Sequence, residues 1–285
     1  MFELAVAASI VSGALCGVLG YYVEKFKITT LSFSVAHAAL AGAALALVLG
    51  LDATYLALVF AVVFALIMGV LSPRLAHERE LVSMGFFSLF NALAIFMIYL
   101  SNVYVLSSAS IAVVLWGSIL AVTKPKLIVL LGSAALFLTY LAFFKHQIDA
   151  ILFDKKLAEA EGVDVYFHTI VLLLFVGTTI ALTLKLTGGF LVFALLYNPV
   201  ASSIRLARSA KRQLILSPVL GACFALLGLA VSYVFDWPVG ATIALVSSLS
   251  LFLSHLARAA ANKMLLLKVA RIGAESREKS KSKSE

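Results

Sequence analysis

Long apolar runs separated by short polar segments constrain this chain more than any other feature. Of its 285 residues, 63% are hydrophobic and only 13% are charged. The runs are close to the length that an α-helix needs to cross the hydrocarbon core of a membrane. They are continuous, whereas the strands of a membrane β-barrel alternate apolar and polar residues. The sequence therefore predicts an all-α fold, a polytopic integral membrane bundle of about nine transmembrane helices, with one transmembrane domain over residues 1–257.

Polar residues and turn signals mark where each span is expected to end. The expected spans cover about residues 3–23, 33–50, 53–72, 84–101, 127–144, 167–185, 188–204, 213–235 and 238–257. A further apolar stretch near 109–122 would reach only about 21 Å as a helix, short of the roughly 30 Å hydrocarbon core. We expect it to form a short re-entrant or surface helix. Small residues such as Gly13 and Gly17 are typical of helices that pack closely in membranes.

The distribution of basic residues predicts the orientation. All 22 lysine and arginine residues except Lys124, Lys126 and Lys185 lie in a few polar segments. These segments are 24–30, 73–83, 145–166, 205–212 and the tail after residue 257. Because cytoplasmic loops are rich in lysine and arginine, we expect an outside N-terminus and a cytoplasmic C-terminus in the plasma membrane. The net charge of +8 then indicates orientation and not nucleic-acid binding.

Two polar regions at the cytoplasmic side are expected to differ in order. The basic tail, residues 258–285, is too polar to bury a core and is expected to be disordered towards its end. The segment at about 153–164 has good helix formers followed by Gly162, which can end a helix in the left-handed conformation. Its faces mix acid and base, whereas a helix lying on lipid headgroups would be richer in lysine and arginine. We expect this segment to dock on a soluble partner protein.

His37 is the clearest functional candidate within a span. Ionisable residues at membrane depth usually face a bundle interior or an aqueous path, and neutral imidazole binds first-row transition metals well. A histidine hydrogen-bonded to a carbonyl of a neighbouring helix is the structural alternative. Asn198, beside Pro199, and Asp236, in an outer turn, are weaker candidates for lining a path. A repaired helix kink and a solvated turn residue are the alternatives for these two.

The sequence contains no signature of an enzyme. A Walker phosphate loop, a His-Glu-x-x-His motif and a Gly-x-Ser-x-Gly motif are all missing from it. We therefore expect no catalytic residues and no resident cofactor. Work against a gradient would draw its energy from another chain or from an ion gradient.

Four stretches of the chain, taken together and in order, form a pattern that is specific enough to indicate a protein family. They are 31–42, 115–122, 153–163 and 188–199, the last continued by Ser232-Tyr233 and residues 236–242. With them the chain resembles the permease subunits of ABC-type importers for zinc, manganese and iron. The resemblance implies a homodimer in membrane lipid that passes a divalent metal ion as its substrate. It also implies a cytoplasmic ATPase subunit that binds ATP and an extracellular solute-binding protein.

In that family the third stretch resembles the coupling helix, which sits in a groove of the ATPase subunit. The resemblance implies that five residues of this chain couple to the ATPase. They are Phe153, Asp154, Ala158, Glu161 and Gly162.

One position departs from the family pattern. Members typically carry an aspartate four residues before the histidine of the second span, which places both groups on one helical face. This chain has Phe33 there, so the carboxylate of the expected pair is absent. Three alternatives follow: His37 acts alone, it acts together with Asn198, or it acts together with another group. The alternative function is an ion-gradient-driven secondary transporter without an ATPase, although the spans hold almost no carboxylates for an ion cycle. A non-transporting membrane scaffold would leave His37 without a role.

Overall fold

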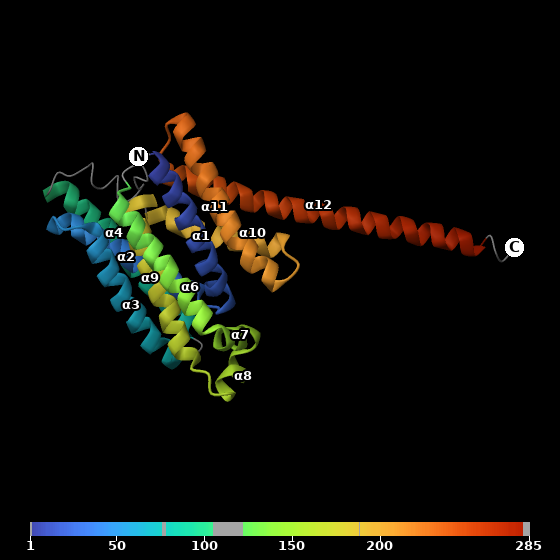
Figure 1. Ribbon diagram of the computed structural model, residues 1–285, viewed down its shortest axis with the longest axis horizontal. Coiled ribbons are helices and arrows are strands. Elements are labelled where there is room, and N and C mark those ends of the chain that lie inside the picture. The colour runs from blue at the N-terminus through green and yellow to red at the C-terminus, as the bar shows by residue number, and fades with distance from the viewer. Residues whose placement is uncertain (1, 76–77, 105–121, 188, 282–285) are drawn as a thin grey trace.

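Helices make up nearly all of the structure that the computed structural model describes, which is residues 2–75, 78–104, 122–187 and 189–281 (Figure 1). The membrane-sized and connecting helices follow in this order: α1 (Phe2–Lys25), α2 (Thr29–Leu49), α3 (Ala53–Leu75), α4 (Arg79–Tyr104), α6 (Lys124–Phe143), α7 (Lys145–Phe153), α8 (Lys155–Ala160), α9 (Val165–Thr187), α10 (Gly189–Leu206), α11 (Ala210–Phe235) and α12 (Val239–Lys281). No strand occurs in these ranges.

The helix lengths confirm the polytopic bundle. Within the described ranges, 8 helices are long and apolar enough to cross a membrane: α1, α2, α3, α4, α6, α9, α11 and α12. The remaining expected span, 188–204, corresponds to α10, whose apolar part Val192–Leu206 is shorter. Residues 109–121 lie outside the described residues, so the short helix expected there stays a prediction.

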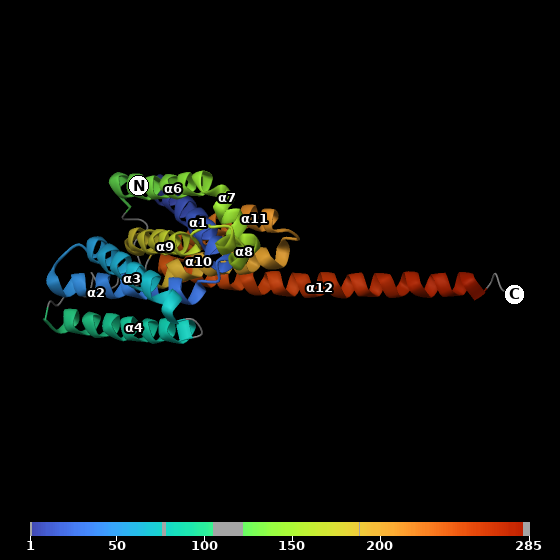
Figure 2. The same ribbon diagram turned by 90° about the horizontal axis from the view of Figure 1, so that it is seen from below.

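The bundle is layered around α2. Figure 2 shows α6 and α4 at opposite edges, with α1, α9 and α2 between them. Burial follows this order, because 78% of the apolar window of α2 is buried, against 11% for α4 and for α6. Alanines crowd α2, and their small side chains let neighbouring helices approach from several sides. Most side chains of α2 are therefore buried among neighbouring helices.

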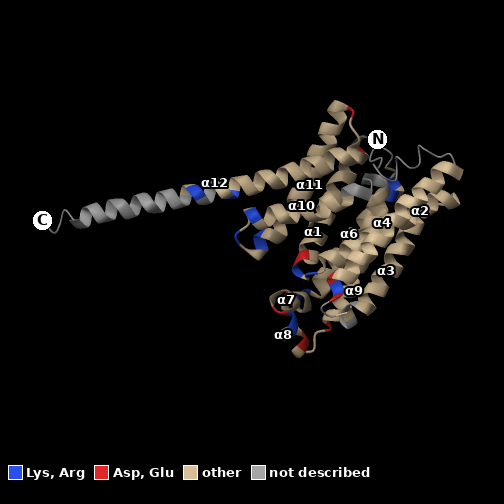
Figure 3. Cartoon of the chain, turned by 180° about the vertical axis from the view of Figure 1, so that it is seen from behind, with Lys and Arg blue, Asp and Glu red and all other residues tan. Residues whose placement is uncertain are grey.

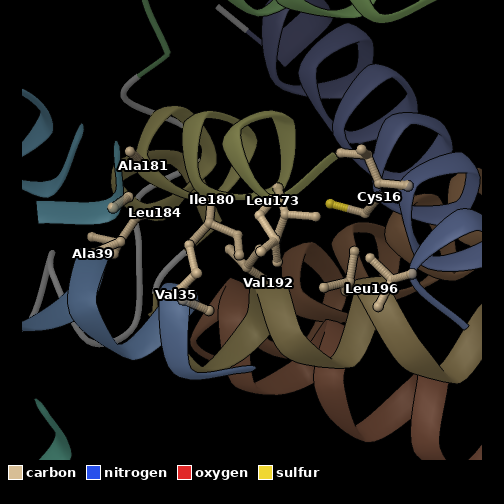
Figure 4. Close-up of a cluster of buried hydrophobic side chains, with 14 of the residues drawn as sticks. Cys16, Val35, Ala39, Leu173, Ile180, Ala181, Leu184, Val192 and Leu196 are labelled. Carbon is tan, nitrogen blue, oxygen red and sulfur yellow. The ribbon is translucent and has the colours of Figure 1, made fainter. Parts of the chain in front are cut away.

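The central apolar core joins four helices. Figure 4 shows Val35 and Ala39 of α2 near Ile180 of α9, with Val192 of α10 and Cys16 of α1 closing the cluster. All five side chains are 1% exposed or less. This packing fixes α2, α9 and α10 relative to one another.

A glycine crossing joins α1 to α11. A Cβ atom added to Gly13 would lie 2.3 Å from the carbonyl oxygen of Gly221, and one added to Gly221 would lie 2.1 Å from that of Gly13. One turn further, the Ser217 hydroxyl donates to the carbonyl oxygen of Gly17 at 2.8 Å. The close packing expected from Gly13 and Gly17 is therefore confirmed, with α11 as the partner helix.

The last helix runs beyond the bundle. α12 reaches Lys281, whereas its membrane-sized part ends at Ala259 (Figure 1). No helix ends at the domain boundary expected at residue 257, and the cytoplasmic location and end disorder of residues 258–285 stay predictions. Figure 3 shows lysine and arginine residues near α7, α8 and the α10–α11 loop, and others on α12.

Candidate functional site

His37 lies inside the bundle, two turns into α2, and is only 5% exposed. Its Nδ1 donates a hydrogen bond of 3.1 Å to the carbonyl oxygen of Phe33. Because a carbonyl oxygen can only accept, the proton of the neutral imidazole is on Nδ1 and Nε2 carries a lone pair. This acceptor belongs to α2 itself and not to a neighbouring helix, and the contact leaves Nε2 in the form that binds a metal ion.

Aromatic rings from three helices surround this imidazole. The ring of Phe193 on α10 stacks on it at 4.5 Å between centroids, and that of Phe87 on α4 meets it edge-on at 4.3 Å. The ring of Phe33 lies 4.9 Å away. Tyr197 of α10 extends the group, with its ring 5.9 Å from that of Phe33. We call Phe33, His37, Phe87, Phe193 and Tyr197 the aromatic cluster.

Polar contacts tie the first turns of α2 to the helices beside it. The Tyr197 hydroxyl lies 2.9 Å from the Ser32 hydroxyl and 3.4 Å from the carbonyl oxygen of Thr29, to which it donates. The Ser34 hydroxyl donates to the carbonyl oxygen of Ser83 on α4. The same end of α2 that carries the aromatic cluster is thus fixed to α10 and α4.

The aromatic cluster offers a metal ion one nitrogen. Among the described residues, no group of three or more His, Cys, Asp and Glu side chains is placed to hold a metal ion. Phe33 supplies a ring where a carboxylate would have added a second ligand. A divalent ion that contacts Nε2 of His37 would therefore keep most of the ligands that it brought with it. A single protein ligand of this kind fits an ion that passes through better than one that is bound permanently.

The other two path candidates make their contacts with residues other than His37. The Asn198 amide donates to the hydroxyls of Ser247 at 2.9 Å and Ser248 at 3.1 Å, so it joins α10 to α12. Asp236 is exposed at the end of α11, in a left-handed conformation with φ 55°. Neither makes a hydrogen bond to His37. The structure therefore does not bring the three together into one site.

The polar segment contains one short helix, α8, which begins two residues later than the sequence suggested. Asp154 adopts an extended conformation between α7 and α8, and its Oδ1 accepts from the backbone N–H groups of Lys156 at 2.8 Å and Leu157 at 3.0 Å. Phe153 therefore ends α7, whereas the sequence suggested that it begins the polar helix. The reason is the aspartate cap, which starts a new helix one residue later.

The end of α8 has the expected glycine. Gly162 has φ +86°, and its N–H donates to the carbonyl oxygen of Glu159 at 3.1 Å. The next N–H, of Val163, donates to the carbonyl oxygen of Ala158 at 2.9 Å. A left-handed residue here turns the chain sharply towards α9.

The surface of this segment combines apolar and charged groups. Phe153 is 83% exposed and Leu157 is 48% exposed, while Asp154 and Glu161 are also exposed. Ala158 is 1% exposed and faces the bundle. We call Phe153 and Leu157 the docking pair. Of the expected coupling residues, Ala158 is therefore the one that is buried.

Lys155 is a buried contact that the sequence did not reveal. Its Nζ donates to the carbonyl oxygen of Phe26, between α1 and α2, and lies 5.7 Å from the centroid of the Phe26 ring. Arg79 of α4 donates to the next carbonyl, of Lys27, at 3.3 Å. Burial lowers the pKa of the Lys155 amine, Arg79 and Lys27 lower it further, and Glu159 opposes them. Nothing in the sequence separates Lys155 from the exposed Lys156.

Similar proteins cover almost the whole chain. A manganese import system permease protein of Streptococcus gordonii, ScaB, is 29% identical over 250 residues, which cover 88% of each chain. The high-affinity zinc uptake system membrane protein ZnuB of Buchnera aphidicola is 25% identical and covers 90% of this chain and 98% of its own.

Two solved structures share the fold. PsaBC from Streptococcus pneumoniae, in complex with a Fab, superposes with a TM-score of 0.75 at 28% identity, covering 88% of this chain and 90% of that chain. A putative metal-chelate type ABC transporter in an inward-facing conformation also gives a TM-score of 0.75, and its 19% identity shows the fold alone. The ABC 3 transport family matches residues 1–258, and the chain belongs to that family.

Proposed function

We propose that this chain is the membrane-spanning permease subunit of an ABC importer and that its cargo is a divalent transition-metal ion such as manganese or zinc. The family match over residues 1–258 carries the proposal. Relatives named for manganese import and zinc uptake support the class of cargo. An imidazole Nε2 with a lone pair at the centre of the bundle supports a direct contact with the ion.

In this proposal the aromatic cluster is a closed gate. The ring of Phe193 stacks on the His37 imidazole and the ring of Phe87 meets it edge-on. Apolar constrictions in channels exclude water and hydrated ions. Passage then requires α4 or α10 to move relative to α2. In this proposal Asp236 would lie at the mouth of the path, and Asn198 would hold α10 against α12 through its bond to Ser247.

The power for this motion comes from a second chain. A cytoplasmic ATPase would bind ATP and dock on the exposed docking pair, while this chain performs no catalysis. A solute-binding protein would deliver the ion on the outer face, and a second copy of this chain would complete the path. The chain would lie in the plasma membrane, with its N-terminus outside the cell and its C-terminus in the cytoplasm.

Purification from the native membrane tests the proposal. We expect an ATPase subunit to copurify with the chain at a stoichiometric level, and its absence would favour the ion-gradient-driven transporter. Phe153→Ala should weaken the copurification. Leu81→Ala is the matched control, because Leu81 is also apolar, 76% exposed and in an expected cytoplasmic segment. Equal losses in both variants would contradict docking at Phe153.

A further inference from the structure

The turn between α1 and α2 receives two cations on consecutive carbonyl groups. Lys155 of α8 donates to the carbonyl oxygen of Phe26, and Arg79 of α4 donates to that of Lys27. The carbonyls at a helix C-terminus have no partner within the helix and carry partial negative charge. Both cations thus satisfy groups that the end of α1 leaves open.

This turn is rigid. Phe26 is 2% exposed and Ile28 is fully buried, while Lys27 holds a left-handed conformation with φ 54°. The ring of Phe26 also faces the Lys155 ammonium at 5.7 Å. A half-buried ammonium that leaves its acceptor loses a charge-assisted hydrogen bond and regains contact with water only in part. When α8 moves, the turn is therefore held to it.

The turn leads directly to the aromatic cluster. α2 begins at Thr29, whose carbonyl oxygen accepts from the Tyr197 hydroxyl, and Ser32 contacts the same hydroxyl. Tyr197 in turn lies against Phe33, and Phe33 lies against His37. Contacts therefore run without a gap from α8 to the imidazole.

We propose that Lys155 is a positioning residue that transmits a displacement of α8 to the start of α2 and so to the aromatic cluster. This inference rests on the proposed function, since an ATPase must displace α8. The lysine touches neither the ion nor ATP. Its role is to keep α8 and the α1–α2 turn moving as one body. A variant that removes the ammonium measures the energetic coupling between the two.

The test compares two lysines in the reconstituted complex of this chain with its ATPase. Lys155→Met removes the ammonium from the turn, and Lys145→Met removes an exposed one at the start of α7. The readout is the number of metal ions transported per ATP hydrolysed. We expect Lys155→Met to lower this ratio by about tenfold, within the 5–150-fold span of allosteric couplings, with ATPase binding retained. Lys145→Met should match the wild type, and Lys155→Arg should restore most of the ratio.

Further variants separate the possible failures. If Lys155→Met matches Lys145→Met in an active complex, the inference is wrong while the proposed function stands. If the wild-type chain neither binds an ATPase nor transports a metal ion, the proposed function itself fails. Should Lys155→Met not fold, Tyr197→Phe removes only the hydroxyl that links α10 to Thr29 and Ser32. It should lower the same ratio, and an unchanged ratio would overturn the route.

Discussion

Gly162 gives the sharpest prediction about the segment that joins α8 to α9. Its φ of +86° is in the region that side chains with a Cβ atom avoid, and no atom lies within 4 Å of a Cβ built there. Gly162→Ala therefore introduces backbone strain and no steric clash with the bundle. Left-handed backbone costs an L-residue about 1–2 kcal/mol.

That cost sets the expected size of the effect. About 1–2 kcal/mol shifts a two-state equilibrium by roughly 5–30-fold. If the docked form of α8 needs the left-handed turn, the population of docking-competent permease falls by this factor. We expect metal transport per ATP hydrolysed to fall by a similar factor, because the ATPase then cycles without moving α2.

Gly50 provides a matched control. It has φ +68°, also has open space around a built Cβ atom, and ends α2 at the opposite end from Thr29. Gly50→Ala should lower thermal stability about as much as Gly162→Ala. Transport per ATP should fall only in Gly162→Ala, and Gly162→Asn should recover part of it because asparagine tolerates this conformation.

The assay is uptake of radioactive manganese or zinc into proteoliposomes, with ATP hydrolysis measured in the same sample. Thermal unfolding of each purified variant gives the strain independently. Equal transport ratios for the two alanine variants would refute the reasoning. The reasoning would also be refuted if Gly162→Ala lost the expected stability but kept the wild-type ratio of metal transported to ATP hydrolysed.

Three further outcomes follow from the packing and from the gate. Gly221→Val should overpack the crossing with Gly13 and cost about 1–3 kcal/mol, seen as a lower unfolding temperature in detergent. Asn198→Ala removes the bonds to Ser247 and Ser248 and should cost roughly 1 kcal/mol, since each interhelical hydrogen bond in membranes is worth about 0.6 kcal/mol on average. An unchanged unfolding temperature would contradict this prediction. His37→Leu should lower uptake about tenfold or more, corresponding to about 1.4 kcal/mol, while ATPase copurification stays unchanged.

The fold could be predicted because the signal for each span is local. Apolar length and polar interruptions predicted a span at 167–185, where α9 runs from Val165 to Thr187, and another at 213–235, where α11 runs from Ala210 to Phe235. Gly162 was also recognisable, since a glycine that ends a run of helix formers is a local pattern. The start of α8 was expected two residues too early, because Asp154 is the cap of the helix and not a part of it.

The surroundings of the site could not be predicted in the same way. His37 stands out because an ionisable residue within a span is rare, but Phe87 and Phe193 are two of 20 phenylalanines in the chain. Only the packing of α4 and α10 on α2 selects them. Likewise, tertiary packing buries Lys155 against Phe26 and leaves Lys156 in water. The partners of Asn198 on α12 follow from the same long-range contacts.

ATP-dependent uptake of a divalent metal ion tests the importer function most directly. Proteoliposomes would hold this chain with its copurified ATPase, and ionophores would collapse any proton or sodium gradient. We predict that uptake of manganese or zinc continues with ATP under these conditions and stops without ATP. Uptake that needs no ATP, or that ends when the ion gradients collapse, would contradict the importer function.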